Sequence, residues 1–315
     1  MKLLVVGGCG YIGSVLVPKL LAKGHFVHVV DTMWFGNHLQ DHLNLTVTPA
    51  DIRNGYVYGN HDACICLAAI ANDPCAEYDA RATMMVNIWG TMRLAEACYH
   101  GGVPRFLFAS SASVYGIKDN APVTEDADLA PVSDYNVAKA CGERILMSYR
   151  DRLLLQIVRP ATVCGPSPRM RFDTIVNKFC ADAFTKGEIT VHVGEGSDLM
   201  RPNIHIDDMT DLYVWLLDHP EARGTFNAGF ENISIRTIAE MVAAETSCKV
   251  NYLPVRDKRS YAVDSSKLLR AGFSPQWTVK DAINQVLAGL MTGSLKVDET
   301  TTNLTWMQKN GWIRG

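Results

Sequence analysis

A tyrosine and a lysine, Tyr135 and Lys139, lie four residues apart in the segment "DYNVAKACGERILMSYRD" (134–151). If this segment is a helix, the spacing places both side chains on one face. An ammonium group one turn away lowers the pKa of a phenol. The phenol could then exchange a proton with a substrate hydroxyl. A solvated helix face would also explain the pair, so the spacing needs support from other residues.

That support comes from the serine-rich stretch "SSASVYG" (110–116), which follows an apolar run. The run predicts a strand, and the carboxyl ends of parallel strands are where such sheets bind ligands. The stretch would therefore lie at a site, with Ser110 and Ser113 as turn or cofactor-side residues beside Ser111. Combined with Tyr135 and Lys139, they indicate an active-site wall.

A glycine-rich loop is the second chemical feature. "GGCGYIGS" contains Gly8, Gly10 and Gly13 in the pattern G-x-G-x-x-G, and Gly7 adds a further glycine. It follows an apolar strand and opens a helix, which is the context that dinucleotide binding requires. Glycines let the backbone turn tightly and approach a pyrophosphate held at the helix N-terminus.

Acidic residues complete the predicted dinucleotide site. Asp31 closes the next apolar strand, 18 residues after Gly13. A carboxylate there accepts hydrogen bonds from both ribose hydroxyls and repels a 2′-phosphate, which favours NAD over NADP. Asp51, after a third strand, could reach the adenine amino group, although a helix N-cap explains it equally well.

The elements that position these residues alternate strand and helix. Apolar strands are predicted at 2–8, 25–31, 45–48, 63–69, 105–111 and 154–160, with helices at 14–24, 83–102 and 134–151. Strands that are apolar throughout and alternate with helices predict a parallel sheet covered on both faces. Right-handed crossovers then give a doubly wound α/β fold.

The rhythm changes after about residue 165. A helix near 172–186, a strand at 189–193, helices at 207–220 and 235–247, and a strand at 225–229 follow, and the tail 297–312 resembles a small helix. We expect a nucleotide-binding domain over 1–165, with late elements from about 203–230. Residues 166–315 would form mainly a smaller mixed α/β cap that binds substrate.

The composition is that of a globular protein without a strongly charged surface. Of 315 residues, 48% are hydrophobic, and 30 basic residues nearly balance 33 acidic ones. We therefore expect no nucleic-acid or membrane partner. The cysteines number nine, an odd count, which favours a reducing cytosol over a disulfide framework. Cys64 and Cys66 alternate within a predicted buried strand, and no metal site is expected.

Together these motifs resemble the extended short-chain dehydrogenases/reductases. The glycine loop, Asp31, "CLAA", "SSASVYG", "YNVAK" and "VRPATVCGPS" occur in the order typical of that family. "RPNIHIDD" and "RSYAVDSSK" are similar to its nucleotide-sugar epimerase/dehydratase branch. The resemblance implies a Rossmann-type domain with NAD, a cap that holds a sugar nucleotide, and a homodimer through the helices near 83–100 and 135–150.

The resemblance also implies site residues. Ser111, Tyr135 and Lys139 would be catalytic, with Tyr135 as acid/base. The expected cofactor residues are Gly7, Gly10, Tyr11, Ile12, Gly13, Asp31, Asp51, Ile52, Leu67, Ala68, Ala69 and Lys139. The expected substrate residues are Ser111, Arg171, Asn177, Arg201 and Arg259. A surface ion pair is the alternative for Arg201 and Arg259, although a pyrophosphate in a cleft favours a bidentate arginine.

Departures from the family pattern restrict the reaction. The sugar-nucleotide 4,6-dehydratases carry Thr-Asp-Glu where this chain has Ser111, Ala112 and Ser113, so dehydration is not expected. "AIANDP" (69–74) and "SPRMRFDTIVNKF" (167–179) resemble members that act on GDP-heptose-type substrates. The leading hypothesis is an NAD-dependent nucleotide-sugar 4-epimerase. The alternatives are a C4 dehydrogenase or keto-sugar reductase, and a non-enzymatic NAD-binding regulator.

Overall fold

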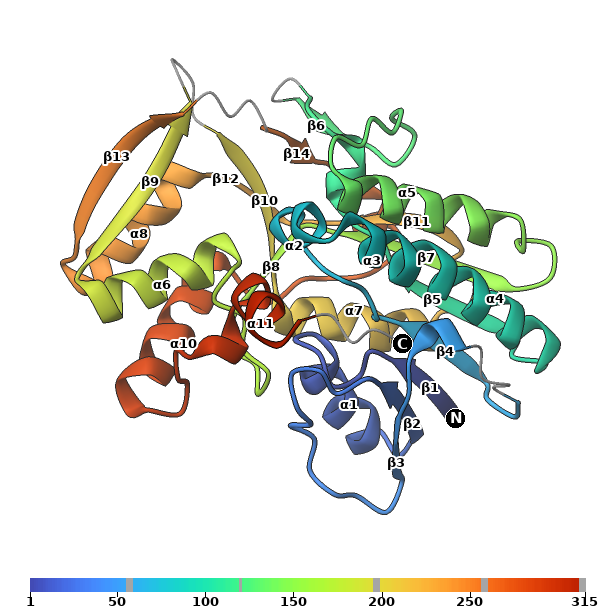
Figure 1. The fold of residues 1–315 in the computed structure, drawn as a ribbon. Helices are drawn as coiled ribbons and strands as arrows, with labels where there is room; N and C mark the ends of the chain where they lie inside the picture. The colour runs from blue at the N-terminus through green and yellow to red at the C-terminus, as the bar shows by residue number, and fades with distance from the viewer. Residues whose placement is uncertain (55–58, 119–120, 195–198, 256–259, 312–315) are drawn as a thin grey trace.

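The computed structural model describes residues 1–54, 59–118, 121–194, 199–255 and 260–311. Its main feature is a seven-stranded sheet in which every pairing is parallel. The strands are β1 (Lys2–Val6), β2 (Phe26–Asp31), β3 (Leu45–Pro49), β4 (Ala63–Cys66), β5 (Arg105–Ala109), β7 (Leu154–Pro160) and β11 (Gly224–Ala228). Their order is β11-β7-β5-β4-β1-β2-β3 (Figure 1). The predicted fold class is confirmed.

The order of the strands places a binding cleft at β1. From β1 the chain builds outward to β2 and β3, then returns to β4 on the other side. This is the topological switch point at which open α/β sheets bind ligands, beyond the carboxyl ends of the strands. Strands β1, β4 and β5 end at Val6, Cys66 and Ala109, two or three residues earlier than predicted. The residues between the observed and the predicted strand ends belong to the loops that face the cleft.

Side chains of β1 alternate between two cores. Leu3 and Val5 pack into one cluster, and Leu4 and Val6 pack into another, so both faces of the sheet are buried. Helices α1 (Gly13–Ala22) and α7 (Ile206–Asp218) contribute to the first cluster. Helices α4 (Thr91–His100) and α5 (Asp134–Met147) contribute to the second.

The predicted helix over 83–102 is divided in the structure. A short α3 (Ala80–Met84) leads into a π-helical turn, Met85–Gly90, which continues as α4. The side chain of Asn87, in the π turn, is fully buried and bonds both the N–H and the carbonyl of Ile70, each at 2.9 Å. Asn87 thus fixes the loop that follows β4.

The second half of the chain forms a smaller mixed unit, drawn at the left of Figure 1. Its strands are β8 (Thr162–Cys164), β10 (Met200–His205) and β12 (Glu231–Ser234) in one sheet, with β9 (Glu188–Gly194) paired in parallel to β13 (Lys249–Val255). Its helices include α6 (Ile175–Lys186), α8 (Ile235–Thr246) and α10 (Val279–Thr292), whereas α9 (Ser266–Arg270) contacts β11 of the large sheet. Two short strands, β6 (Pro122–Val123) and β14 (Ala262–Val263), pair across the two halves.

The last elements return to the first unit. A 3-10 turn (Glu299–Thr301) leads into α11 (Asn303–Asn310). Met307 of α11 is buried in the same cluster as Val6 and Val30. We expected the tail to form a small helix in the cap, but its apolar side completes a core of the nucleotide-binding unit.

Candidate active site

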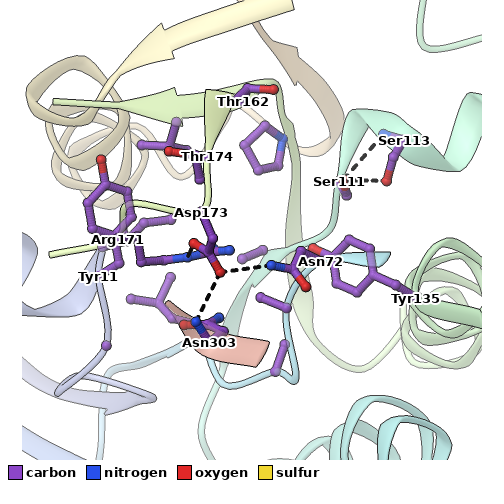
Figure 2. Close-up of a pocket in the computed structure, with 18 of the residues that line it drawn as sticks. Tyr11, Asn72, Ser111, Ser113, Tyr135, Thr162, Arg171, Asp173, Thr174 and Asn303 are labelled. Carbon is purple, nitrogen blue, oxygen red and sulfur yellow. Dashed lines mark hydrogen bonds and ion pairs between the residues drawn. The ribbon is translucent and has the colours of Figure 1, made fainter. Parts of the chain in front are cut away.

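A cavity of about 380 Å³ opens at the carboxyl end of the sheet (Figure 2). The glycine loop, the loop after β4, the serine-rich turn and the 160–175 segment all line it. Figure 2 shows Tyr11 of the glycine loop beside Arg171 and across from Ser111. Predicted site residues that line it are Gly7, Gly10, Tyr11, Ile12, Gly13, Leu67, Ala69, Ser111, Tyr135, Lys139, Arg171 and Arg201. Residues as far apart in the sequence as Gly7 and Arg201 therefore line the same cavity.

The glycine loop leaves no room for side chains. A Cβ on Gly7, whose φ is +85°, would lie 2.5 Å from the backbone nitrogen of Ala68. A Cβ on Gly13 would lie 2.5 Å from the carbonyl oxygen of Gly8. The bare backbone therefore packs against the β4 loop, and α1 begins at Gly13, which lines the cavity, so the positive end of this helix lies at the cleft. These features fit the pyrophosphate of a dinucleotide.

A second, smaller cavity of about 140 Å³ continues from the first. Asp31, Asp51, Ile52 and Ala68 line it. Backbone N–H groups of Cys9 and Met33 bond the two carboxylate oxygens of Asp31, at 2.9 and 2.8 Å, and fix its orientation. Burial raises the pKa of Asp31, and these two bonds oppose the rise. The carboxylate lines the smaller cavity, which fits the expected contact with a dinucleotide ribose.

Asp51 caps a short helical turn and also forms an ion pair. Its Oδ1 accepts the backbone N–H of Arg53 at 2.8 Å, at the start of the 3-10 turn Ile52–Asn54. Its carboxylate contacts the guanidinium of Arg53 at 2.7 Å. Burial acts to raise the pKa of Asp51, but the bonds and charge of Arg53 hold it below its usual value. Asp51 stays a candidate adenine contact because it lines the second cavity.

Ser111, Tyr135 and Lys139 meet in the larger cavity because two elements start there. Ser111 caps the 3-10 turn after β5, and its Oγ lies 2.7 Å from Oγ of Ser113. Tyr135 stands in the first turn of α5, which Ser133 caps by accepting the N–H of Asn136 at 3.2 Å. Figure 2 shows Ser111 and Tyr135 on the same side of the cavity. Lys139 follows one turn later on α5.

The expected effect of Lys139 on Tyr135 is corrected by the structure. Burial raises the pKa of Tyr135 to about 12, while the charge of Arg171 and a hydrogen bond with Ser111 oppose that rise. Arg171, and not Lys139, is the cation that lowers the pKa of the phenol here. The Nζ of Lys139 donates to the carbonyl of Ala109 at 2.7 Å and lies 6.0 Å from the Tyr135 ring centre. Burial lowers the pKa of Lys139 to about 8.

The neighbouring serines have structural partners. Ser110 donates to the carboxylate of Glu143, which also pairs with Arg159 at 2.7 Å. Ser113 donates to Oδ1 of Asn136 at 2.5 Å. The side chain between them, Ala112, is fully buried. Of the three serines, Ser111 is therefore the one best placed to contact substrate.

A polar network that the sequence analysis missed crosses the cavity. Asp173 accepts from Nε of Arg171 at 2.8 Å, from Nδ2 of Asn72 at 2.9 Å and from the backbone of Asn303 at 3.1 Å. Figure 2 shows these groups converging on the Asp173 carboxylate. Burial acts to raise the pKa of Asp173, but Arg171 and the other donors hold it low. Asp173 is therefore a carboxylate in the resting site.

Asn72 has a strained backbone within this network. Its φ of 78° and ψ of 157° lie in a region that almost only glycine adopts. Its Oδ1 accepts the N–H of Cys75 at 3.0 Å and caps α2 (Asp73–Tyr78). The Asn-Asp-Pro sequence was a usable signal, because an asparagine before a proline at the first turn is typical of a helix start.

The predicted substrate residues have different surroundings. Arg171 and Arg201 line the larger cavity. Asn177 is fully buried and bonds Gly165 and Tyr11, so among the described residues it supports the cavity wall and does not line it. Arg259 lies outside the described residues.

Two further kinds of feature were sought within the described ranges. None of the described helices is both long and apolar enough to cross a bilayer. The described residues contain no group of three His, Cys, Asp or Glu side chains that could hold a metal ion.

Comparison with known proteins agrees with this geometry. Residues 3–229 match the NAD dependent epimerase/dehydratase family. A UDP-glucose 4-epimerase of Mycolicibacterium smegmatis is 32% identical over 227 residues, which are 68% of this chain and 72% of that protein. A GDP-6-deoxy-D-talose 4-dehydrogenase of Aggregatibacter actinomycetemcomitans is 29% identical over 282 residues, or 85% and 90% of the two chains.

A solved structure shows the same fold. A UDP-N-acetylglucosamine 4-epimerase from Methanobrevibacter ruminantium superposes with a TM-score of 0.85 at 23% identity, covering 93% of this chain and 98% of that one. The match to the family spans most of the nucleotide-binding unit and its site. The chain is thus an NAD-dependent nucleotide-sugar enzyme of the epimerase/dehydratase family, within the extended short-chain dehydrogenases/reductases.

Proposed function

We propose that this enzyme is a nucleotide-sugar 4-epimerase. The observation that carries the proposal is the convergence of Ser111, Tyr135 and Lys139 on one cavity with the glycine loop. A proton-transferring phenol beside a dinucleotide cradle is suited to reversible oxidation of a secondary alcohol.

Each of the three side chains has a separate task in this proposal. Tyr135 removes the proton from the C4 hydroxyl of the sugar and later returns one. Ser111 bonds the same oxygen and keeps it within reach of the phenol. Lys139, held by the Ala109 carbonyl, supplies positive charge on the cofactor side of the site. NAD, when bound, accepts and returns the hydride at C4. The cofactor would be cradled by Gly7, Gly10 and Gly13 with Asp31 at its ribose.

Dehydration receives no support from the serine turn. Elimination of water needs a positioned acid and base, and Ala112 and Ser113 provide neither. Two carboxylates do line the cavity, Asp73 and Asp173. Asp173 is paired with Arg171, and Asp73 accepts a bond from Ser133 at 2.7 Å. Both are held by these partners in the site as described.

A one-way C4 dehydrogenase or keto-sugar reductase is the second candidate. It uses the same three residues but releases the keto sugar. The similarity to a GDP-6-deoxy-D-talose 4-dehydrogenase over 90% of that protein favours it. Cap shape and cofactor retention separate the two reactions.

Product analysis tests the proposal directly. The purified enzyme is incubated without oxygen with GDP-, UDP-, ADP- and dTDP-sugars, and NADH and the sugar isomers are both measured. An epimerase forms the C4 isomer with no net NADH. One NADH per substrate, or a released ketone, would establish the dehydrogenase instead.

The substrate residues remain proposals of the same kind. We assign the substrate pyrophosphate to Arg201 and the sugar side to Ser111 and Arg171, because all three line the cavity. Asn177 would act indirectly by holding the Arg171 carbonyl at 3.0 Å. Arg259 is proposed from the sequence alone.

We also propose a homodimer through the helices near 83–100 and 135–150. Met85, Trp89, Tyr99 and Met147 on these helices are 39–43% exposed despite their apolar character. Such a patch marks a contact surface. Trp89→Lys should give a monomer in sedimentation experiments.

A cytosolic location is proposed on the basis of nine free thiols, most of them buried.

A further inference from the structure

One buried arginine, Arg169, lacks an anionic partner in the described structure. It is 3% exposed and lines the larger cavity, and its side chain donates from Nη2 to Oδ1 of Asn303 at 2.6 Å. Its Nε is buried and has no hydrogen-bond partner. Burying an unpaired cation is costly, so such a group is expected to meet an anion when the site is filled.

The surroundings of Arg169 are those of the cofactor cleft. Its backbone N–H donates to Oγ of Ser14 at 3.3 Å, one residue after the glycine loop. Its guanidinium stacks on Phe35, 3.8 Å from the ring centre. Phe35 lines both cavities and follows Asp31 on the ribose side. Asp173 and Asp31 lie near enough to act on Arg169 by charge, but its guanidinium has no ion pair with either among the described residues. A dinucleotide bound at the glycine loop would bring its pyrophosphate to this part of the cleft.

The C-terminal helix holds this arginine in place. Asn303 begins α11 and lines both cavities, and Met307 lines the second. The ring of Trp306 lies 6.2 Å from that of Phe35, on the same side of the cleft. The N–H of Phe172 donates to the carbonyl of Thr301 at 2.8 Å, which ties the helix to the loop that carries Arg169. Residues 299–310 lie beyond the span matched to the family.

We propose that Arg169, positioned by Asn303 of the C-terminal helix, binds the pyrophosphate of NAD and that α11 closes the cofactor cleft. The glycine loop then contacts the pyrophosphate with its backbone, and Arg169 contacts it with a bidentate cation. The proposal rests on the proposed function only in taking NAD as the cofactor. It adds that cofactor retention depends on the end of the chain.

Binding measurements test the proposal without turnover. Arg169→Met replaces the cation with an apolar side chain, a change that buried sites often tolerate. Titration calorimetry with NAD, ADP-ribose and adenosine compares this variant with wild type and with Arg270→Met, which removes an exposed arginine. Loss of charge-assisted bonds should weaken NAD and ADP-ribose about 10- to 100-fold. Adenosine, which has no phosphate, should bind all three proteins equally.

The role of the helix is tested separately. Asn303→Ala should weaken NAD binding less than Arg169→Met, and the two losses should not add, because both act through one guanidinium. Gln308→Ala, on an exposed position of α11, is the control. The rate of NAD release from the loaded enzyme should rise in the first two variants only.

The outcomes separate the two proposals. Unchanged NAD and ADP-ribose binding in Arg169→Met would overturn this inference and leave the proposed function intact. Loss of GDP or UDP binding with NAD binding unchanged would also overturn it, since Arg169 would then belong to the substrate. A wild-type protein without NAD affinity would contradict the cofactor assignment and this inference together.

Discussion

The backbone N–H of Asn303 lies 3.1 Å from Oδ2 of Asp173, across 130 residues of sequence. Asn72 donates to the same oxygen at 2.9 Å. One carboxylate therefore joins α11 to the loop after β4, and Figure 2 shows both bonds meeting at Asp173. This contact therefore helps to position both Arg171 on the substrate side and α11 at the cofactor cleft.

Asp173→Asn should loosen the last helix. It leaves the buried Arg171 without its counter-charge, and breaking a buried ion pair costs about 3–5 kcal/mol. We expect a lower free energy of unfolding and faster proteolytic cleavage near 299–310. Asp126→Asn, at an exposed carboxylate, is the control. Equal cleavage rates in both variants would contradict a linking role for Asp173.

Gly7→Ala should abolish tight NAD binding. The new Cβ would lie 2.5 Å from the nitrogen of Ala68, so the loop must move away from the β4 strand end. Gly24→Ala is a matched control, since Gly24 also has a positive φ (+78°) but nothing within 4 Å of its Cβ position. Gly24→Ala should lose about 1 kcal/mol of stability from backbone strain and bind NAD normally. Calorimetric titration of both variants with NAD distinguishes crowding from strain.

Tyr135→Phe should lower turnover by about 10²- to 10⁴-fold, the range typical for loss of a general acid or base. NAD binding and the melting temperature should change little, because the phenol oxygen is the only atom removed. Tyr78→Phe, on an exposed tyrosine of α2, serves as the comparison. Near wild-type turnover in Tyr135→Phe would mean that another group moves the proton.

Lys139 should make stability depend on pH. Its pKa is about 8 in the folded protein against 10.5 for a free lysine. Between these values the unfolded chain holds more protons, so the free energy of unfolding gains with rising pH. Between pH 8 and 10.5, the free energy of unfolding of the cofactor-free wild type should rise by up to about 3 kcal/mol relative to that of Lys139→Met. The difference is read from urea unfolding at each pH, and a constant difference would contradict the lowered pKa.

The sequence predicted the parts of the site that local patterns encode. The apolar runs of β1 and β4, the glycine loop and Asp31 identified the sheet and its dinucleotide cleft. Ser111 was found because it follows an apolar run that predicts a strand. Tyr135 and Lys139 were found because they lie four residues apart in a predicted helix. Their shared position at one cavity follows from parallel strands ending at one edge.

Other parts depend on contacts that no local pattern contains. Asp173, Asn72 and Asn303 meet only after the whole chain has folded, and each has an ordinary local explanation as a turn or cap residue. The pKa of Tyr135 depends on burial by several elements, whereas the i, i+4 spacing suggested only the lysine. The π turn at Met85–Gly90 is likewise linked to a distant contact, the bonds of Asn87 to Ile70.

The place of Met307 has a consequence for how the protein is made. This side chain is translated long after Val6, yet both belong to one core cluster. The nucleotide-binding unit therefore cannot complete its core as soon as the strands of its sheet have been translated, as amino-terminal domains often do. Removing residues 299–315 should therefore expose the core cluster that contains Val6 and Val30 to solvent.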